Sequence, residues 1–201
     1  MLTSPRAERG VTLVELMIGL VVMAVLLAAG IPSFGNWIQG AHIRDTAESL
    51  QSGLNLARAE AVRRNTAVRL ELDADASWTV GCDVPLVDQD GDGADDCPAA
   101  IQARPASGGG VRASVAMSQV AAASGATAVA PDATSALVFN GLGRVASGLA
   151  TGNLAVFDIR NPGGGDCAPE GTMRCLRVIV TTAGQVRMCD PAVAAGDPRG
   201  C

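Results

Sequence analysis

The chain has 201 residues, of which 48% are apolar and 17% are charged, and its formal net charge is −5. This composition excludes a chain that is disordered throughout, because such sequences combine few apolar residues with high charge. The length allows one domain with an extended element, or two small domains at most. The acidic charge does not favour nucleic-acid binding by the chain as a whole, although it leaves room for a local basic patch.

A short polar segment opens the chain, and a long apolar run follows it. Residues 1–10 are polar and carry two arginines, and residues 11–34 are apolar except for small residues and three polar ones, Thr12, Glu15 and Ser33. As a helix, the run would span roughly 36 Å at ~1.5 Å per residue, which exceeds a ~30 Å hydrocarbon core. The preceding arginines would keep the N-terminus cytoplasmic. We therefore predict a transmembrane helix at 11–34, with everything after it outside.

Two simpler interpretations compete with a specialised anchor. One is a secretory signal cleaved near Ala28, and the other is a plain signal anchor. Both have to explain Glu15, a carboxylate about one turn into the apolar run, where an ionised group is costly and usually has a partner or a function. A cleaved signal would also end its apolar region near the cut, whereas the helical pattern here continues well beyond it.

The run G-V-T-L-V-E-L-M-I, from Gly10 to Ile18, resembles the type IV prepilin signature, a glycine followed by an apolar residue and then T-L-x-E. The resemblance implies cleavage after Gly10 by prepilin peptidase and N-methylation of the new terminus at Val11, where the signature most often has phenylalanine. It also implies that the Glu15 carboxylate meets the N-terminal amine of a neighbouring subunit. Two opposite charges buried in a helix bundle are tolerable only as a pair, so this pair would set the subunit register.

The helical pattern continues beyond the apolar run. Pro32 predicts a kink, because proline lacks an N–H group and clashes with the preceding turn; pilins commonly carry a proline at this depth. From Trp37 onward, apolar residues recur every three or four positions and form one stripe: Ile43, Ala47, Leu50, Leu54, Ala57 and Ala61. Asn65 predicts the helix end. We expect one helix over 11–64, with an amphipathic half at 35–65.

After the helix the periodicity changes to two. Residues 67–72 alternate apolar and charged side chains, as a half-buried strand does, and 78–80 is the expected partner. Turn signals such as Asn140-Gly141 separate further predicted strands at 136–140, 144–146, 153–159, 175–181 and 185–189. The segment 104–135 is rich in Ala, Ser and Gly, and we expect loop there with one strand near 111–117. The predicted fold class is α+β: a long, partly transmembrane N-terminal helix packed on an antiparallel β-sheet head formed by 66–201.

A second resemblance covers more of the chain. The stretch 47–65, with the later motifs F-N-G-L-G-R at 139–144 and G-Q-V-R at 184–187, resembles the FimT/FimU and general-secretion-pathway H subfamily of pilin-like proteins. The likeness is close over the first 65 residues and rests on isolated motifs in the head. It implies an antiparallel β head packed on the second half of the helix.

Six cysteines in the last two-thirds of the chain predict disulfides formed in an oxidising compartment. Zinc is disfavoured, because there is no C-x2-C pair and His42 is the only histidine. Six cysteines allow 15 pairings. We prefer the pairing of sequence neighbours, in which each bond closes a short loop: Cys82–Cys97, Cys167–Cys175 and Cys189–Cys201. A structural role is favoured over a redox role, since nothing nearby indicates an activated thiolate.

The acidic segment between Cys82 and Cys97 resembles the first part of a calcium loop. Its carboxylates match loop positions 1, 3, 5 and 9: Asp88, Asp90, Asp92 and Asp96. Position 12 is Ala99, so the usual bidentate glutamate is missing. The segment is therefore either a calcium site or a turn of solvated charges.

Some pilins of the FimT type are DNA receptors in natural transformation, through a C-terminal G-R-x-R element. In this chain the element reads Gly184-Gln185-Val186-Arg187, so one arginine is lost. Phosphate binding needs several convergent cations. The candidate DNA-binding residues are those near this element in the predicted sheet: Arg144, Arg174, Arg177 and Arg187.

We predict no catalytic activity, because a Ser-His-Asp or Cys-His site needs an orienting base and the chain has a single histidine. No cofactor other than calcium is expected. The resemblances imply a minor type IV pilin that takes part in pilus assembly and initiation as a structural subunit. They leave two alternatives, an H-type minor pseudopilin of a type II secretion system and a DNA-binding pilin. The implied partners are other minor and major pilins, prepilin peptidase, the inner-membrane assembly platform and inner-membrane lipid. The head would lie in the periplasm and later on the pilus filament at the cell surface.

Overall fold

The structure, a computed structural model, describes residues 10–73, 75–87, 96–105, 113–121, 136–194 and 196–201, with backbone only at 29–36. The chain divides into two compact units, an N-terminal unit of residues 1–38 and a head of residues 39–201. One helix, α1 (Leu13–Arg64), supplies the described helical part of the N-terminal unit and also enters the head. The fold is α+β, as predicted.

In the N-terminal unit, α1 starts at Leu13, two residues after the expected start at Val11. The backbone stays helical through Pro32. The kink predicted at Pro32 stays a prediction. The side chains of residues 29–34, the end of the predicted span, lie outside the described part. Within the described residues, no helix combines the length and the apolar character needed to cross a membrane.

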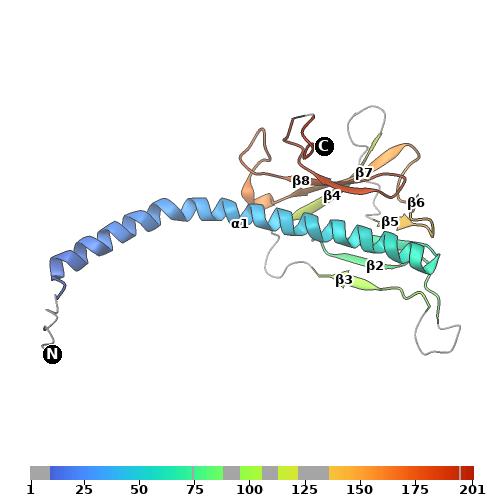
Figure 1. Cartoon of the computed structure of the whole chain (residues 1–201), viewed down its shortest axis with the longest axis horizontal. Coiled ribbons are helices and arrows are strands. Elements are labelled where there is room, and N and C mark those ends of the chain that lie inside the picture. The colour runs from blue at the N-terminus through green and yellow to red at the C-terminus, as the bar shows by residue number, and fades with distance from the viewer. Residues whose placement is uncertain (1–9, 74, 88–95, 106–112, 122–135, 195) are drawn as a thin grey trace, which may run out of the picture. The chain divides into compact units, whose positions relative to one another are not determined.

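In the head, the second part of α1 buries the predicted stripe. Each of its six residues is at most 1% exposed, and the helix lies beside both β-sheets (Figure 1). Leu50 and Leu54 are among the largest fully buried side chains of the chain. Burying an aliphatic side chain of this size contributes roughly 1.5–3 kcal/mol, so this stripe is a main source of head stability.

The helix ends at the predicted residue. Asn65 adopts a left-handed conformation with φ +49°. The Thr66 N–H donates to the Ala61 carbonyl at 3.2 Å, and the Asn65 N–H donates to the Val62 carbonyl at 3.3 Å. These two bonds form a Schellman motif, in which asparagine is tolerated because its short polar side chain accepts the left-handed region.

Five strands form the first sheet, in the order β3-β2-β1-β5-β6. They are β1 (Val68–Leu72), β2 (Trp78–Cys82), β3 (Gln102–Arg104), β5 (Ala136–Phe139) and β6 (Val145–Ser147). All pairings are antiparallel. In β1 the residues Val68, Leu70 and Leu72 are buried while Arg69 and Glu71 point away, which confirms the predicted alternation.

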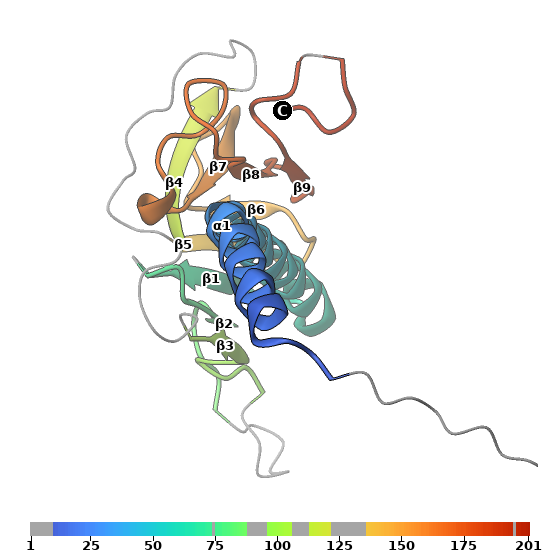
Figure 2. The same cartoon turned by 90° about the vertical axis from the view of Figure 1, so that its left-hand side faces the viewer.

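Four strands form the second sheet, in the order β4-β7-β8-β9. They are β4 (Ser114–Ala121), β7 (Asn153–Arg160), β8 (Leu176–Val180) and β9 (Val186–Cys189). A short 3-10 helix, η1 (Pro162–Gly164), follows β7. Both sheets contribute to one core with α1, and in Figure 2 the strands form an arc from β9 above α1 to β3 at its lower left.

The strand predictions missed one strand and placed another a few residues too early. The strand β3 was not expected, because Gln102-Ala103-Arg104 is short and has no apolar alternation; at the end of the sheet it is exposed or half-buried throughout. The strand expected near 111–117 is present, a few residues later, at Ser114–Ala121. Its pairing with β7 along all eight residues sets this position, and such a partner far along the chain leaves no local signal.

The three disulfides join the preferred pairs. The Cα–Cα distances are 5.7 Å for Cys82–Cys97, 5.5 Å for Cys167–Cys175 and 5.2 Å for Cys189–Cys201. The first connects the end of β2 to the segment that leads into β3, the second closes the segment before β8, and the third ties the C-terminal residue to the end of β9. Each bond therefore fastens a loop to a strand end, as a structural role requires.

Candidate functional site

The T-L-V-E motif forms the N-cap of α1. The Glu15 N–H donates to the Thr12 hydroxyl at 3.3 Å, and the Thr12 N–H and hydroxyl each donate to the Glu15 carboxylate at 3.5 Å. This is a capping box, in which two residues satisfy main-chain donors that have no partner in the first helical turn. Sequence reasoning missed this role of Thr12, although a Thr-x-x-Glu spacing before an apolar run is its usual signal.

The helical segment after the cap has an apolar surface on every side. All thirteen large apolar residues between Val11 and Leu27 are between 53% and 76% exposed. A helix that is apolar all round is normally covered by lipid or by other helices. Glu15 is the single acidic residue of this stretch. The segment therefore combines an apolar surface on every side with a single carboxylate, which accepts hydrogen bonds from Thr12.

Two of the candidate DNA-binding arginines pair with carboxylates of the second sheet. The Arg174 Nε donates to an oxygen of the Asp190 carboxylate at 2.5 Å, and the Asp190 side chain is only 4% exposed. The other Asp190 oxygen accepts the Ala192 N–H at 3.0 Å. The Arg177 guanidinium contacts the Asp158 carboxylate at 2.8 Å, across the β7–β8 register. Neither arginine is free to neutralise a phosphate without giving up its partner.

Among the described residues, the other two candidate arginines, Arg187 and Arg144, do not pair with a carboxylate. The Arg187 guanidinium donates to the main-chain oxygen of Cys201 at 3.3 Å. Arg144 is exposed, and within the described part of the chain its side chain has no hydrogen bond or ion pair. Three of the four candidate arginines therefore bond to other groups of the protein, and among the described residues only Arg144 does not.

This distribution predicts weak DNA binding. With one uncommitted arginine, binding of the full chain to duplex DNA is expected to depend on salt with a log–log slope no steeper than about −1, since each phosphate contact contributes ~−0.9. Fluorescence anisotropy in detergent across a salt series measures this slope, with Arg144→Ala and Arg187→Ala compared in parallel. A slope of several units that both substitutions reduce would contradict the prediction.

The G-x-G and G-x-x-R turns of the second resemblance meet at the end of α1. A Cβ at Gly184 would lie 1.9 Å from the Gly143 carbonyl oxygen, and one at Gly143 would lie 3.1 Å from the Arg58 Nε. The Val145 N–H donates to the Thr182 oxygen at 3.1 Å. The two turns therefore join the β5–β6 connection of the first sheet to the β8–β9 connection of the second, which is a structural function for these motifs.

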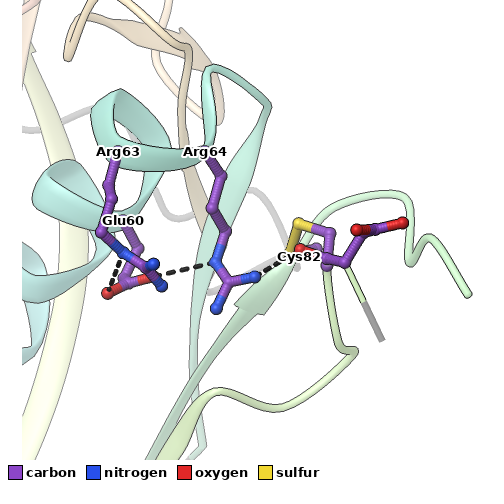
Figure 3. The surroundings of a disulfide bond; sticks show 6 residues. Glu60, Arg63, Arg64 and Cys82 are labelled. Carbon is purple, nitrogen blue, oxygen red and sulfur yellow. Dashed lines mark hydrogen bonds and ion pairs between the residues drawn. A yellow bond between two sulfur atoms is a disulfide. The ribbon is translucent and has the colours of Figure 1, made fainter. Parts of the chain in front are cut away.

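An arginine at the end of α1 donates a hydrogen bond to Asp96, the residue before Cys97. Arg64 contacts the Glu60 carboxylate at 2.9 Å and also donates to the main-chain oxygen of Asp96, next to the Cys82–Cys97 disulfide (Figure 3). The hydrogen bond from Arg63, assisted by Arg64, holds the pKa of the Glu60 carboxyl below its usual value. The helix end and the disulfide thereby hold Asp96 and Cys97, which precede β3.

The predicted calcium site stays a prediction. Asp88, Asp90 and Asp92 lie outside the described residues, and Asp96 is described. Among the described residues no group of three His, Cys, Asp or Glu side chains could hold a metal ion.

The C-terminal loop closed by Cys189–Cys201 carries its own ion pair. The Arg199 guanidinium, together with the Arg199 N–H, donates to the Asp197 carboxylate and lowers the pKa of that carboxyl to about 2. A depressed pKa adds stability above the unfolded pKa and loses it as the pH falls through the folded one. The pair is therefore complete at neutral pH and is lost only in strong acid.

The comparisons with known proteins identify the class and then the family. The prokaryotic N-terminal methylation motif matches residues 5–31, which contain Gly10, Val11 and Glu15, so the chain has the N-terminal segment of a pilin-like protein. The chain belongs to the GspH family, because the family described as type II transport protein GspH matches residues 46–184. These matches confirm the expected FimT/FimU and GspH type of minor pilin or pseudopilin.

Similar solved structures include a minor pilin and a minor pseudopilin. The type IV minor pilin FimU of Pseudomonas aeruginosa has 15% sequence identity and a TM-score of 0.47, over 78% of this chain and 94% of that one. The minor pseudopilin EpsH from the type 2 secretion system of Vibrio cholerae has 16% identity and a TM-score of 0.44, over 75% of this chain and 98% of that one. No curated protein matches the chain.

Proposed function

We propose that the chain is a minor subunit of a type IV pilus, with a structural role in starting assembly or near the filament tip. The observation that carries this proposal is the apolar surface of the segment between Val11 and Leu27, exposed on every side. Apolar surface left in water costs about 25 cal/mol per Å². A segment of this kind persists only when lipid covers it before assembly and neighbouring helices cover it afterwards.

The composition of the segment fits close helix packing. Between helices in lipid there is no hydrophobic driving force, so association depends on van der Waals contact and favours small residues. Gly19, Ala24 and Ala28 supply such positions. Glu15 would pair with the N-terminal amine of a neighbouring subunit. The partners would be minor and major pilins, with prepilin peptidase and the inner-membrane assembly platform acting earlier.

Processing provides the first test. Mass spectrometry of the intact protein, extracted from membranes of its native host, is expected to show that residues 1–10 are missing and that Val11 carries one methyl group. This follows from the position of Gly10 before the capped helix and within the matched methylation motif. A chain that keeps Met1 in cells with active prepilin peptidase would contradict the proposal.

The second candidate is a minor pseudopilin of a type II secretion system, which the description of the matched family, type II transport protein GspH, supports. Deleting the gene separates the two. Loss of surface pili with normal protein secretion, restored by the wild-type gene, supports the pilus. Loss of secretion with normal piliation supports the pseudopilin. In either system we expect the head to lie in the periplasm during assembly and to lack enzymatic activity.

A further inference from the structure

A groove of about 490 Å³ lies between α1 and the end of the first sheet. The helix lines one wall with residues at spacings of three and four, and β3 lines the other. The lining residues include Asp45, Glu48, Trp78, Gln102, Ala103 and Arg104. The volume falls within the ~300–1,000 Å³ of ligand-binding clefts. All of these residues belong to the head.

The floor of the groove is fixed by Trp78. This side chain is 4% exposed, and its indole N–H donates to the Ser49 hydroxyl at 3.0 Å. A Cβ at Gly53 would lie 3.0 Å from the indole ring, so the glycine permits this close approach of helix and strand. The floor is therefore preformed and apolar, with its one polar group already satisfied.

The walls of the groove have a net negative charge. Arg104 spans the groove to Asp45 at 2.8 Å, which neutralises one carboxylate. The second carboxylate, Glu48, is exposed, and among the described residues it has no hydrogen bond or ion pair. Two carboxylates and one guanidinium leave one net negative charge. A partner that brings a single cation to Glu48 completes this arrangement.

The outer edge of β3 carries main-chain groups that point away from the sheet. Val80 accepts the Ile101 N–H at 2.7 Å, and the Cys82 N–H donates to Pro98, so alternate residues of β2 face β3. Gln102 and Arg104, opposite Val80 and Trp78, face back toward β2. Because main-chain groups alternate along a strand, the N–H and C=O of Ala103 point away from the sheet. Within the described part of the chain, no strand pairs with this edge.

We infer that this groove receives an extended segment of a neighbouring pilus subunit, which adds to the edge of β3 at Ala103 and places a lysine or arginine against Glu48. Strand addition takes its affinity from main-chain hydrogen bonds and its specificity from side-chain pockets. The groove offers main-chain hydrogen bonds through the outward N–H and C=O of Ala103. It offers side-chain specificity through the Glu48 carboxylate, which is unpaired among the described residues, beside an apolar floor. This inference rests on the proposed function, since the occupant is another subunit of the filament.

The test uses the full chain in its native host, with a photocrosslinking amino acid at Gln102. We expect crosslinks to an extended segment of another pilin that contains a lysine or arginine, identified by mass spectrometry. Glu48→Lys should lower the crosslink yield by about fivefold, the upper range for one exposed ion pair. Glu170→Lys, the same charge change at an exposed residue outside the groove, should leave the yield unchanged.

A second pair of variants tests the strand edge. Ala103→Pro removes the outward N–H, which an edge strand tolerates, and should lower the yield about fivefold, as expected for one hydrogen bond. Ala103→Ser keeps the N–H and should match the wild type. If Ala103→Pro prevents folding, Glu48→Lys decides alone, because it lies on an exposed helix position.

A crosslinker at Val21 separates failure of the groove from failure of the proposed function. Crosslinks from Val21 to other pilins without any from Gln102 would overturn the groove and leave the filament role intact. Crosslinks from neither position would overturn both. Crosslinks from Gln102 to a helical or acidic segment, or a yield that Glu48→Lys does not change, would also overturn the inference.

Discussion

Replacing Glu15 with glutamine is expected to remove the chain almost completely from purified filaments. The carboxylate lies at the start of a helix whose apolar surface must be covered by neighbours, so in a filament it would be buried with an N-terminal amine. Breaking a buried ion pair by removing one partner costs about 3–5 kcal/mol, which corresponds to a loss of more than ~100-fold. Quantitative mass spectrometry of sheared filaments, normalised to the cellular content of the chain, measures this loss.

The capping box offers a matched control for the same experiment. Glutamine at position 15 still accepts hydrogen bonds and preserves the box, so Glu15→Gln removes the charge alone. Thr12→Ala removes the hydroxyl that caps the helix and keeps the carboxylate; it should cost about 1 kcal/mol of helix stability and leave incorporation near normal. Normal incorporation of Glu15→Gln together with loss of Thr12→Ala would show that Glu15 acts through the cap and not through its charge.

The elements that could be predicted from the sequence are those with local signals. The buried stripe of α1 repeats every three or four residues, and Asn65 ends the helix through its own left-handed conformation. The strand β1 alternates strictly, and each disulfide joins cysteines within 15 residues of each other. In all of these the information lies within a short stretch of chain, where periodicity and spacing can express it.

The features that were missed depend on contacts across the fold. The edge strand β3 exists because β2 lies beside it, and its own three residues carry no pattern. The ion pairs of Arg177 with Asp158 and of Arg174 with Asp190 depend on how the strands are placed in the fold. The sequence could place these arginines near one another, but it could not show that each forms an ion pair with a carboxylate. The same holds for Gly143 and Gly184, whose motif resemblance gave no hint that their turns touch.

The contact between these two turns leads us to expect a large loss of stability when Gly184 is replaced. Gly184 has φ +79°, and a Cβ there would lie 1.9 Å from the Gly143 carbonyl oxygen, a rigid main-chain atom. Because this contact joins the two sheets, the clash cannot be relieved by moving one flexible side chain. The turns must separate, and the hydrogen bond from the Val145 N–H to the Thr182 oxygen lies in the same junction.

Gly184→Ala is therefore expected to destabilise the protein by about 3–5 kcal/mol, the range of strain and lost packing at a special backbone position. Gly152→Ala is the matched control, because Gly152 has φ +81° with nothing within 4 Å, so alanine meets the same strain without the clash. That strain alone costs about 1–2 kcal/mol. Urea unfolding of the full chain in detergent with intact disulfides, followed by tryptophan fluorescence, gives both values. Equal losses in the two variants would mean that the turns do not hold the sheets together; a loss at Gly184 larger by about 2 kcal/mol assigns the remainder to their contact.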